Sequence, residues 1–263
     1  MINWIGSPDD PRLEPYRHVG DPEWLRHHDL FVAEGRLIVD RLIALESSFV
    51  IRSILVNRAA HDALLEALSS VDTEVYVCDD ATLIGITGFN FHRGCLALAN
   101  RPPAQPPDPL LEARCVLALE GVGNPDNVGG LFRTAAAFGA GGVLLNATAG
   151  DPLYRKAIRT SMGAALRLPF ARVDDWLGTL ERFREAGFRI VALTPQADAV
   201  PIAEFQDGTG RSARLVLLLG AEGPGLRDDT LGRADARVRI PIDSAVDSLN
   251  VVVAAGIALQ RLC

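Results

Sequence analysis

The segment 119–141, LEGVGNPDNVGGLFRTAAAFGAG, contains the residues whose types and spacing are best suited to hold a bound molecule. It passes from the end of an expected strand, through a turn rich in glycine and asparagine, into an expected helix. Asn124 followed by Pro125 is typical of a helix start, although Asn127 could cap a slightly later one. In either register, the unpaired backbone N–H groups of the helix start face the turn.

A single arginine, Arg133, lies on this expected helix. Helical side chains lean toward the N-terminus, so Arg133 should reach back over Gly129 and Gly130. Two glycines inside a helix cost about 1 kcal/mol each relative to alanine, which indicates that something comes close to this surface. A phosphate or a sugar is one candidate. Tight packing against another part of the backbone is the alternative.

A second segment, LLLGAEGPGLRDD at 217–229, ends a buried strand at Gly220 and places Glu222 among glycines and a proline. A carboxylate held at a strand end can orient a neighbouring cation or accept hydrogen bonds from a ligand. An ordinary turn with a solvated Glu222 explains the same residues equally well.

A third segment, RIPIDSAVDSLNVVVAAGIALQ at 239–260, leads into an apolar helix. Ser248 and Asn250 could cap this helix or line a site at its start. Simple capping has at least equal weight for Ser248. We expect Asn250 to need a hydrogen-bond partner, because the rest of the helix is apolar nearly all round and is expected to be buried.

The elements that position these three segments alternate regularly. Expected strands lie at 115–119, 143–146, 168–171, 189–194, 214–219 and 237–240, and expected helices at 128–138, 153–165, 176–186, after 226 and from about 249. Strands that are continuous apolar runs, separated by helices, indicate an α/β fold with a mostly parallel sheet covered on both faces. Ligands bind such sheets beyond the carboxyl ends of the strands, which points to the loops 120–127, 220–227 and 241–249.

The first hundred residues predict a smaller α/β domain. We expect an irregular arm at 1–28, an amphipathic helix at 31–45, strands at 51–56, 74–78 and 94–99, and a helix at 61–68. Five prolines in RPPAQPPDP, at 101–109, exclude a continuous helix or a central strand. The predicted division is therefore a domain at 1–100, a linker at 101–111 and a domain at 112–263.

Composition limits the classes of function. The net charge of −7 arises within residues 1–100, so bulk charge does not indicate nucleic-acid binding, although the balanced remainder could carry a local basic face. The four cysteines have no metal-ligand spacing and are expected to be reduced thiols, with no metal site. No secretory signal and no membrane-spanning run is recognisable, so we expect a soluble, cytoplasmic protein.

Taken together, NPDNVGGLFRTAAAFG, LLLGAEGPGL and IPIDSAVDSLNVVVAAGI resemble the motifs of the SpoU, or TrmH-like, family of RNA ribose 2′-O-methyltransferases, and they occur in the family's order. The segment RTSMGAALRLPF, at Arg159–Phe170, is similar to an intermediate motif of this family. The N-terminal part resembles the small RNA-binding domain that often precedes the catalytic domain, through FVAEG and GCLALA. Val252 is a departure, because relatives frequently have serine there.

The resemblance implies S-adenosylmethionine as cofactor, bound in a C-terminal trefoil knot, and a homodimer with the last helix near the interface. By motif position, Thr194, Gly220, Ile240 and Leu249 are the implied cofactor contacts. Arg133 matches the catalytic arginine of the family, and we expect Asn127, Glu222, Ser248 and Asn250 to fix its geometry. A guanidinium is a poor base, so binding a phosphate and stabilising a developing oxyanion is the safer role for Arg133.

The predicted substrate is rRNA or tRNA. A basic run comprises Arg155, Lys156, Arg159, Arg167 and Arg172. Some of these residues could contact the phosphates of the RNA, and the first three are the candidates. For each residue alone, a solvated helix face is the simpler interpretation. Two other functions remain open, namely a non-catalytic RNA-binding protein on the same scaffold and a knotted methyltransferase that acts on a base. A nicotinamide enzyme is disfavoured, because GVGNPDNVGG does not have the spacing of a dinucleotide fingerprint.

Overall fold

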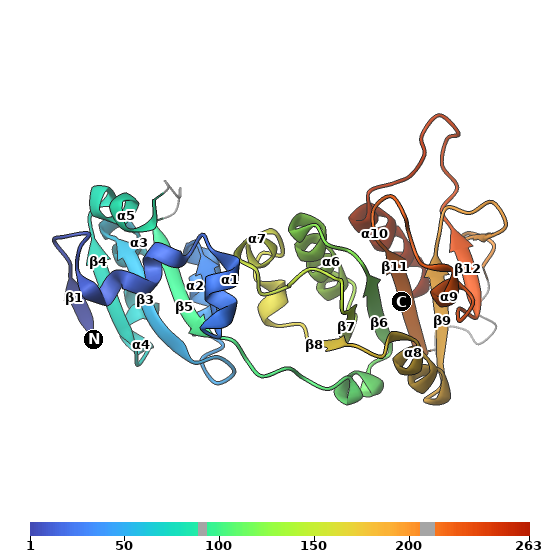
Figure 1. The fold of residues 1–263 in the computed structure, drawn as a ribbon, viewed down its shortest axis with the longest axis horizontal. Helices are drawn as coiled ribbons and strands as arrows, with labels where there is room; N and C mark the ends of the chain where they lie inside the picture. Colours follow the sequence, from blue (N-terminus) through green and yellow to red (C-terminus); the bar gives the residue numbers. More distant parts are fainter. Residues whose placement is uncertain (89–93, 206–213) are drawn as a thin grey trace. The chain divides into compact units, whose positions relative to one another are not determined.

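The proline-rich segment 101–111 lies where the chain passes between two units in the computed structural model, which describes residues 1–88, 94–205 and 214–263 (Figure 1). Unit 1 comprises Met1–Pro103 together with Leu153–Leu166, and unit 2 comprises Ala104–Pro152 and Arg167–Cys263. The predicted division at 100 and 112 stays a prediction. It differs from these units over Leu153–Leu166.

Unit 1 is built around a five-stranded sheet with the order β1-β4-β3-β5-β2. Strands β1, β4 and β3 run parallel, whereas β5 is antiparallel to both β3 and β2. Its strands are β1 (Ile2–Trp4), β2 (Leu30–Glu34), β3 (Ile51–Asn57), β4 (Glu74–Cys78) and β5 (Cys95–Asn100). Its helices are η1 (Pro11–His18), α1 (Pro22–His27), α2 (Arg36–Ile43), α3 (Arg58–Ala63), α4 (Leu65–Ser70), α5 (Asp80–Thr87), α7 (Arg155–Thr160) and η3 (Ala164–Leu166).

The irregular arm expected at 1–28 is wrong. Its first residues form β1, which pairs in parallel with β4, and η1 buries Leu13 and Tyr16 completely. Prolines at the starts of η1 and α1 are compatible with helical structure, because the first N–H groups of a helix have no intrahelical partner. The segment is therefore part of the core of unit 1.

The helix expected at 31–45 is also only partly correct. Residues Leu30–Glu34 form β2, in which Phe31 pairs with Ala99 of β5, and the helix begins at Arg36. Gly35 separates the two elements with a φ of 96°, a conformation that favours glycine. Pairing with β5 decides the structure of an apolar run whose spacing is also compatible with a helix.

Unit 2 contains a seven-stranded sheet with the order β10-β12-β9-β11-β6-β7-β8, and all its described pairings are parallel. This confirms the predicted parallel α/β sheet. The strands are β6 (Cys115–Glu120), β7 (Gly142–Asn146), β8 (Phe170–Val173), β9 (Phe188–Leu193), β10 (Val200–Pro201), β11 (Arg214–Gly220) and β12 (Ala236–Arg239). The helices are η2 (Asp108–Glu112), α6 (Pro125–Ala137), α8 (Trp176–Glu185), α9 (Asp228–Leu231) and α10 (Val251–Leu262).

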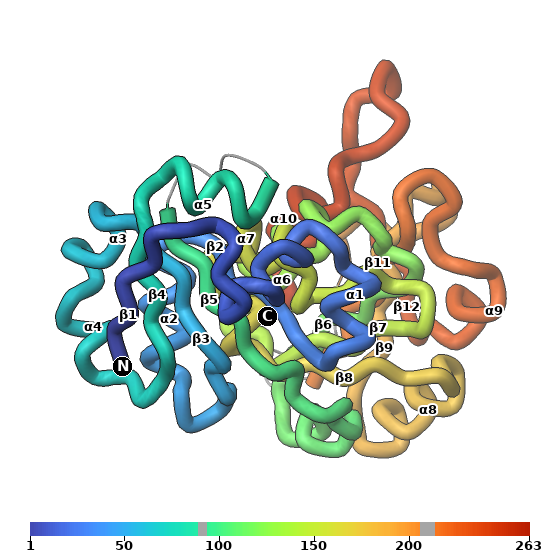
Figure 2. Tube along the Cα trace, turned by 60° about the vertical axis from the view of Figure 1, so that its left-hand side comes forward, coloured from blue at the N-terminus to red at the C-terminus, as the bar shows by residue number. Residues whose placement is uncertain are grey.

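Helices cover both faces of this sheet, as predicted. One face is covered by α8 and α9, through Trp176, Leu180 and Phe183 of α8 and Leu231 of α9. The other face is covered by α6 and α10, which pack against each other and against β7 and β11 respectively. The tip of the segment between β12 and α10 projects away from unit 2 in both views (Figure 1, Figure 2), and its residues 241–248 are exposed.

Two of the four cysteines are not thiols, contrary to expectation. Cys115, at the start of β6, forms a disulfide with Cys263, whereas Cys78 and Cys95 are free and buried. Cys115 and Cys263 are 148 positions apart, and no spacing motif in the sequence indicates that they pair. Within the described ranges, no helix combines the length and apolar character needed to cross a bilayer.

Candidate functional site

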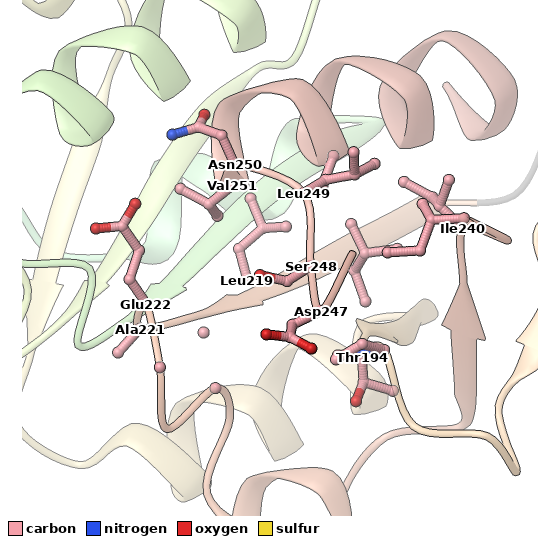
Figure 3. Close-up of a pocket in the computed structure, with 17 residues that line it drawn as sticks. Thr194, Leu219, Ala221, Glu222, Ile240, Asp247, Ser248, Leu249, Asn250 and Val251 are labelled. Carbon is pink, nitrogen blue, oxygen red and sulfur yellow. The ribbon is translucent and has the colours of Figure 1, made fainter. Parts of the chain in front are cut away.

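The carboxyl ends of three neighbouring strands, β12, β9 and β11, open onto a cavity of about 500 Å³ in unit 2 (Figure 3). The loops that follow these strands and the first turns of α10 form its walls. The lining residues are Leu193, Thr194, Pro195, Leu219, Gly220, Ala221, Glu222, Gly223, Gly225, Ile240, Ile242, Asp247, Ser248, Leu249, Asn250, Val251 and Ala254. The cavity therefore lies where parallel sheets usually bind ligands.

The structure brings most of the predicted site residues together at this cavity. All four expected cofactor positions line it, namely Thr194, Gly220, Ile240 and Leu249. Glu222, Ser248 and Asn250 line it as well. Asn127 and Arg133 do not; both lie on α6, and Asn127 reaches the cavity wall through hydrogen bonds.

The loop after β11 needs its glycines. A Cβ at Gly220 would lie 2.3 Å from the backbone carbon of Gly225, so no larger residue fits there. The loop then closes on itself, since Gly225 donates its N–H to the carbonyl oxygen of Ala221 over 3.0 Å. Gly223 and Gly225 have φ values of 85° and 73°. This closed turn directs Glu222 toward α6.

A chain of hydrogen bonds links the three loops predicted to carry the site. Asn250 Nδ2 donates to Asn127 Oδ1 over 3.1 Å, and Asn127 Nδ2 donates to Glu222 Oε1 over 2.5 Å. The Oδ1 atom of Asn250 accepts the N–H of Val252 at 2.9 Å, so the orientation of its amide is fixed. Asn127 is 6% exposed, and both ends of its side chain have partners. The direction of donation is therefore set along the whole chain.

Asn250 is the N-cap of α10 and is exposed, although we expected it to lie inside a buried helix start. Ser248 does not cap the helix and is exposed at the cavity. The sequence left open whether these residues cap the helix or line a site. Ser248 lines the cavity only, whereas Asn250 both caps α10 and lines the cavity. Asn124, with Pro125 after it, is confirmed as the N-cap of α6.

Thr194 holds the loop after β9. Its N–H donates to the carbonyl oxygen of Val238 at 3.0 Å, and its hydroxyl accepts the N–H of Gln196 at 3.3 Å. Thr194 is 8% exposed. The cavity wall is consequently anchored to β12 at this point.

Glu120 is a buried carboxylate that the sequence did not single out. It is 3% exposed, accepts the N–H of Arg227 at 2.7 Å, and accepts a hydrogen bond from the hydroxyl of Thr230. These bonds attach the end of the 220–227 loop to β6. A buried carboxylate without such donors would be strongly destabilising, so Glu120 makes the position of this loop depend on β6.

Arg133 is exposed, and the part of the chain that the structure describes offers it no hydrogen bond or ion pair. The glycine beneath it has a packing role. A Cβ at Gly130 would lie 2.7 Å from Cγ2 of Val252, so the close approach is between α6 and α10. Of the two alternatives for the close approach, packing within the protein therefore applies at Gly130, whereas the guanidinium of Arg133 is exposed.

Three of the five residues in the predicted basic run, Arg155, Arg159 and Arg172, have protein partners in the structure. Arg155 and Arg159 form ion pairs with Glu34 of β2, at 2.8 Å and 3.0 Å, and the Glu34 side chain is 9% exposed. Arg172 donates to the carbonyl oxygens of Asn146, Ala147, Ala149 and Gly150, and so holds the loop after β7. Gly150 of this loop donates in turn to Val122, beside the start of α6.

Asp247 is a further lining residue that the sequence did not identify. Figure 3 shows its carboxylate between Ser248 and Thr194. Its place directly before Ser248 in the third segment was the available signal. Among the described residues, no group of three or more His, Cys, Asp or Glu side chains is arranged to hold a metal ion.

Residues 114–260 match the SpoU rRNA Methylase family. An uncharacterized tRNA/rRNA methyltransferase of Mycobacterium bovis is 38% identical over 262 residues, which cover 98% of this chain and 90% of the relative. The fold is similar to that of an AdoMet-bound rRNA methyltransferase from Sinorhizobium meliloti, with a TM-score of 0.81, 24% identity and coverage of 99% and 97%. An RNA 2′-O ribose methyltransferase structure has a TM-score of 0.77, 24% identity and coverage of 100% and 98%.

Proposed function

Because the chain belongs to the SpoU rRNA methylase family, we propose that it transfers a methyl group from S-adenosylmethionine to a ribose 2′-hydroxyl of rRNA or tRNA. The names of its relatives support an RNA substrate, and the 2′-O ribose methyltransferase of similar fold supports the ribose as acceptor. We further propose a trefoil knot formed by the segment leading to α10, as the family resemblance implies.

The cavity has the size and surface that this cofactor needs. Its volume of about 500 Å³ lies in the range of small-molecule sites. Leu193, Leu219, Ile240, Leu249 and Val251 give it apolar walls against which a purine can lie. The turns at the strand ends would offer backbone N–H and C=O groups to the polar edge of the base. Thr194, Gly220, Ile240 and Leu249 would make these contacts.

The observation that carries the proposal is the hydrogen-bond chain from Asn250 through Asn127 to Glu222. It joins the wall of the cofactor cavity to the helix that bears Arg133. A methyl transfer needs the acceptor oxygen in line with the bond that breaks, and such positioning can supply several kcal/mol. These hydrogen bonds hold the first turn of α6 at the cavity wall, and we propose that Arg133, further along the same helix, acts on substrate bound beside the cavity.

Arg133 donates hydrogen bonds in this mechanism. S-adenosylmethionine supplies an electrophilic methyl group on a sulfonium. In the transfer, the 2′-oxygen would take this methyl group and lose its proton to solvent, and the electron pair of the carbon–sulfur bond would stay with sulfur. A guanidinium stays protonated at neutral pH, so Arg133 stabilises the developing negative charge on the oxygen and binds the adjacent phosphate. Ser248, on the cavity wall, would help to fix the geometry of the reacting groups.

Two surfaces would complete the enzyme. The domain 1–100 would bind RNA, together with those faces of Arg155, Lys156 and Arg159 that Glu34 leaves accessible. A homodimer would cover the outer face of α10, where Val253 is 52% exposed and Ile257, one turn later, is 40% exposed. Sedimentation of the purified protein tests the dimer.

The test of function has two measurements. Titration calorimetry with S-adenosylmethionine should give saturable binding. Mass mapping of rRNA and tRNA from a strain lacking the protein should reveal one nucleotide that has lost a ribose methyl group, restored by the wild-type chain. Absence of cofactor binding would favour a non-catalytic RNA-binding protein. If the lost methyl group were on a base, the acceptor would be that base and not a ribose.

A further inference from the structure

Two carboxylates line the cavity and extend from different walls. Glu222 comes from the loop after β11, and Asp247 from the segment before α10 (Figure 3). None of the lining residues of the described chain is a lysine or an arginine. Glu222 already accepts a hydrogen bond from Asn127, whereas Asp247 has no hydrogen bond or ion pair within residues 1–88, 94–205 and 214–263. The cavity is therefore acidic, and the carboxylate of Asp247 has no partner among the described residues.

We propose that Asp247 makes the cavity discriminate between the cofactor and the spent product by charge. This inference rests on the proposed function. S-adenosylmethionine carries a sulfonium, an ammonium and a carboxylate, and so has a net charge of +1 near pH 7. S-adenosylhomocysteine, the product that remains after methyl transfer, has a neutral thioether and no net charge. A carboxylate near the sulfur favours the cofactor and releases the product.

The size of the effect follows from the exposure of Asp247. Opposite unit charges near a protein surface attract each other, but Asp247 is exposed, and water and salt screen such a charge. We expect Asp247 to contribute about a 2- to 5-fold preference for the charged ligand. Glu222 acts in the same direction, but its hydrogen bond to Asn127 makes it unsuitable for a clean test.

Another role for Asp247 gives a different result. If its carboxylate bound the ammonium group of the methionine part, both ligands would lose affinity equally on removal of the charge, because both carry that group. Selectivity between the two ligands therefore separates recognition of the sulfonium from recognition of the shared ammonium.

The experiment is titration calorimetry on the full chain with three ligands. These are S-adenosylmethionine, S-adenosylhomocysteine and an analogue in which a charged amine replaces the sulfonium. Asp247→Asn is the test variant. Asp243→Asn is the matched control, since Asp243 lies on the same segment, accepts the N–H of Ala245 at 2.8 Å and does not line the cavity.

In Asp247→Asn, the Kd of S-adenosylmethionine and of the amine analogue should rise about 2- to 5-fold, and the Kd of S-adenosylhomocysteine should rise less than about 2-fold. Added salt should weaken binding of the cationic ligands to the wild type more than to the variant. Equal increases for all ligands, or no change, would overturn the proposal. So would the same selectivity loss in Asp243→Asn. If the wild type binds none of the ligands, the proposed function itself fails.

Discussion

Asn250 donates a hydrogen bond from Nδ2 to Oδ1 of Asn127, which lies 123 positions earlier in the chain, and the two amides join the starts of α10 and α6. The amide of Asn250 also caps α10 through its oxygen. One residue thus stabilises its own helix and aligns a second one. These two roles can be separated by substitution.

Asn250→Asp should keep the cap and break the link. A carboxylate still accepts the N–H of Val252, and aspartate is a good N-cap residue, but it cannot donate to Asn127. Asn127 can respond only by turning its amide, which then points its oxygen at Glu222. We expect the thermal midpoint to stay near the wild-type value, while the rate of RNA methylation falls about 10-fold, the scale of one lost hydrogen bond.

Asn250→Ala is the companion variant, because it loses both roles. It should lose the same activity and, in addition, about 1 kcal/mol of unfolding free energy. Wild-type activity in Asn250→Asp would contradict the alignment role.

Arg133→Ala should lower the methylation rate roughly 10²- to 10³-fold, the effect of one missing donor to a transition-state oxyanion. Arg133 is exposed and does not line the cavity, so the Kd for S-adenosylmethionine should barely change. Single-turnover rates and calorimetry measure the two quantities separately. Arg133→Lys should recover part of the rate, since lysine keeps the charge but lacks the forked donors. A parallel loss of cofactor affinity would argue for a structural role.

Gly130→Ala should destabilise the protein even though alanine is the better helix former by about 1 kcal/mol. The new methyl group would meet Val252, a stiff β-branched residue, at 2.7 Å. Overpacking of this kind costs about 1–3 kcal/mol, and the double change Gly130→Ala with Val252→Ala should relieve it. Urea unfolding measures these differences.

Gly256→Ala is the control for this series. Gly256 lies within α10, and its nearest neighbour, Cγ2 of Thr134, is 3.6 Å from the position that the added methyl group would take, an ordinary contact. This change should leave stability equal or raise it by up to about 1 kcal/mol. If both glycine variants behaved alike, the contact with Val252 would not explain the effect.

Cys263→Ser should lower stability under oxidising conditions. The disulfide with Cys115 spans 148 positions, and the chain-entropy argument gives on the order of 5 kcal/mol as an upper value for so long a loop. Dithiothreitol should lower the urea midpoint of the wild type in the same way and have no further effect on the variant. Thiol titration of the unfolded wild type should find two reactive groups before reduction and four after it.

The parallel sheet and most of the cavity could be predicted from local patterns. Continuous apolar runs such as LVLLLG specify buried parallel strands, and the strand-end rule then places the polar loops at one edge. Gly220, Ile240 and Leu249 were implied by the resemblance to the family, and they line the cavity because they lie in or beside those loops. These residues belong to short segments of the sequence that meet at one edge of the sheet.

Features that depend on distant pairing were not predictable in this way. The run at 31–45 has apolar spacing that is compatible with a helix, and only β5 makes its first part a strand. Glu120 looked like the last residue of a strand, and its partners Arg227 and Thr230 lie more than a hundred positions away. The purpose of Gly130 depends on Val252, which is equally remote in sequence.

The pairing of Glu34 with Arg155 and Arg159 determines when unit 1 can be completed during synthesis of the protein. Unit 1 begins at the first residue, yet it includes Leu153–Leu166, which the ribosome adds only after β6, α6 and β7 of unit 2. Until then, a nascent chain carries the Glu34 carboxylate without its two cations. Unit 1 therefore reaches its final form late in translation, after the first strands of unit 2 have been synthesised.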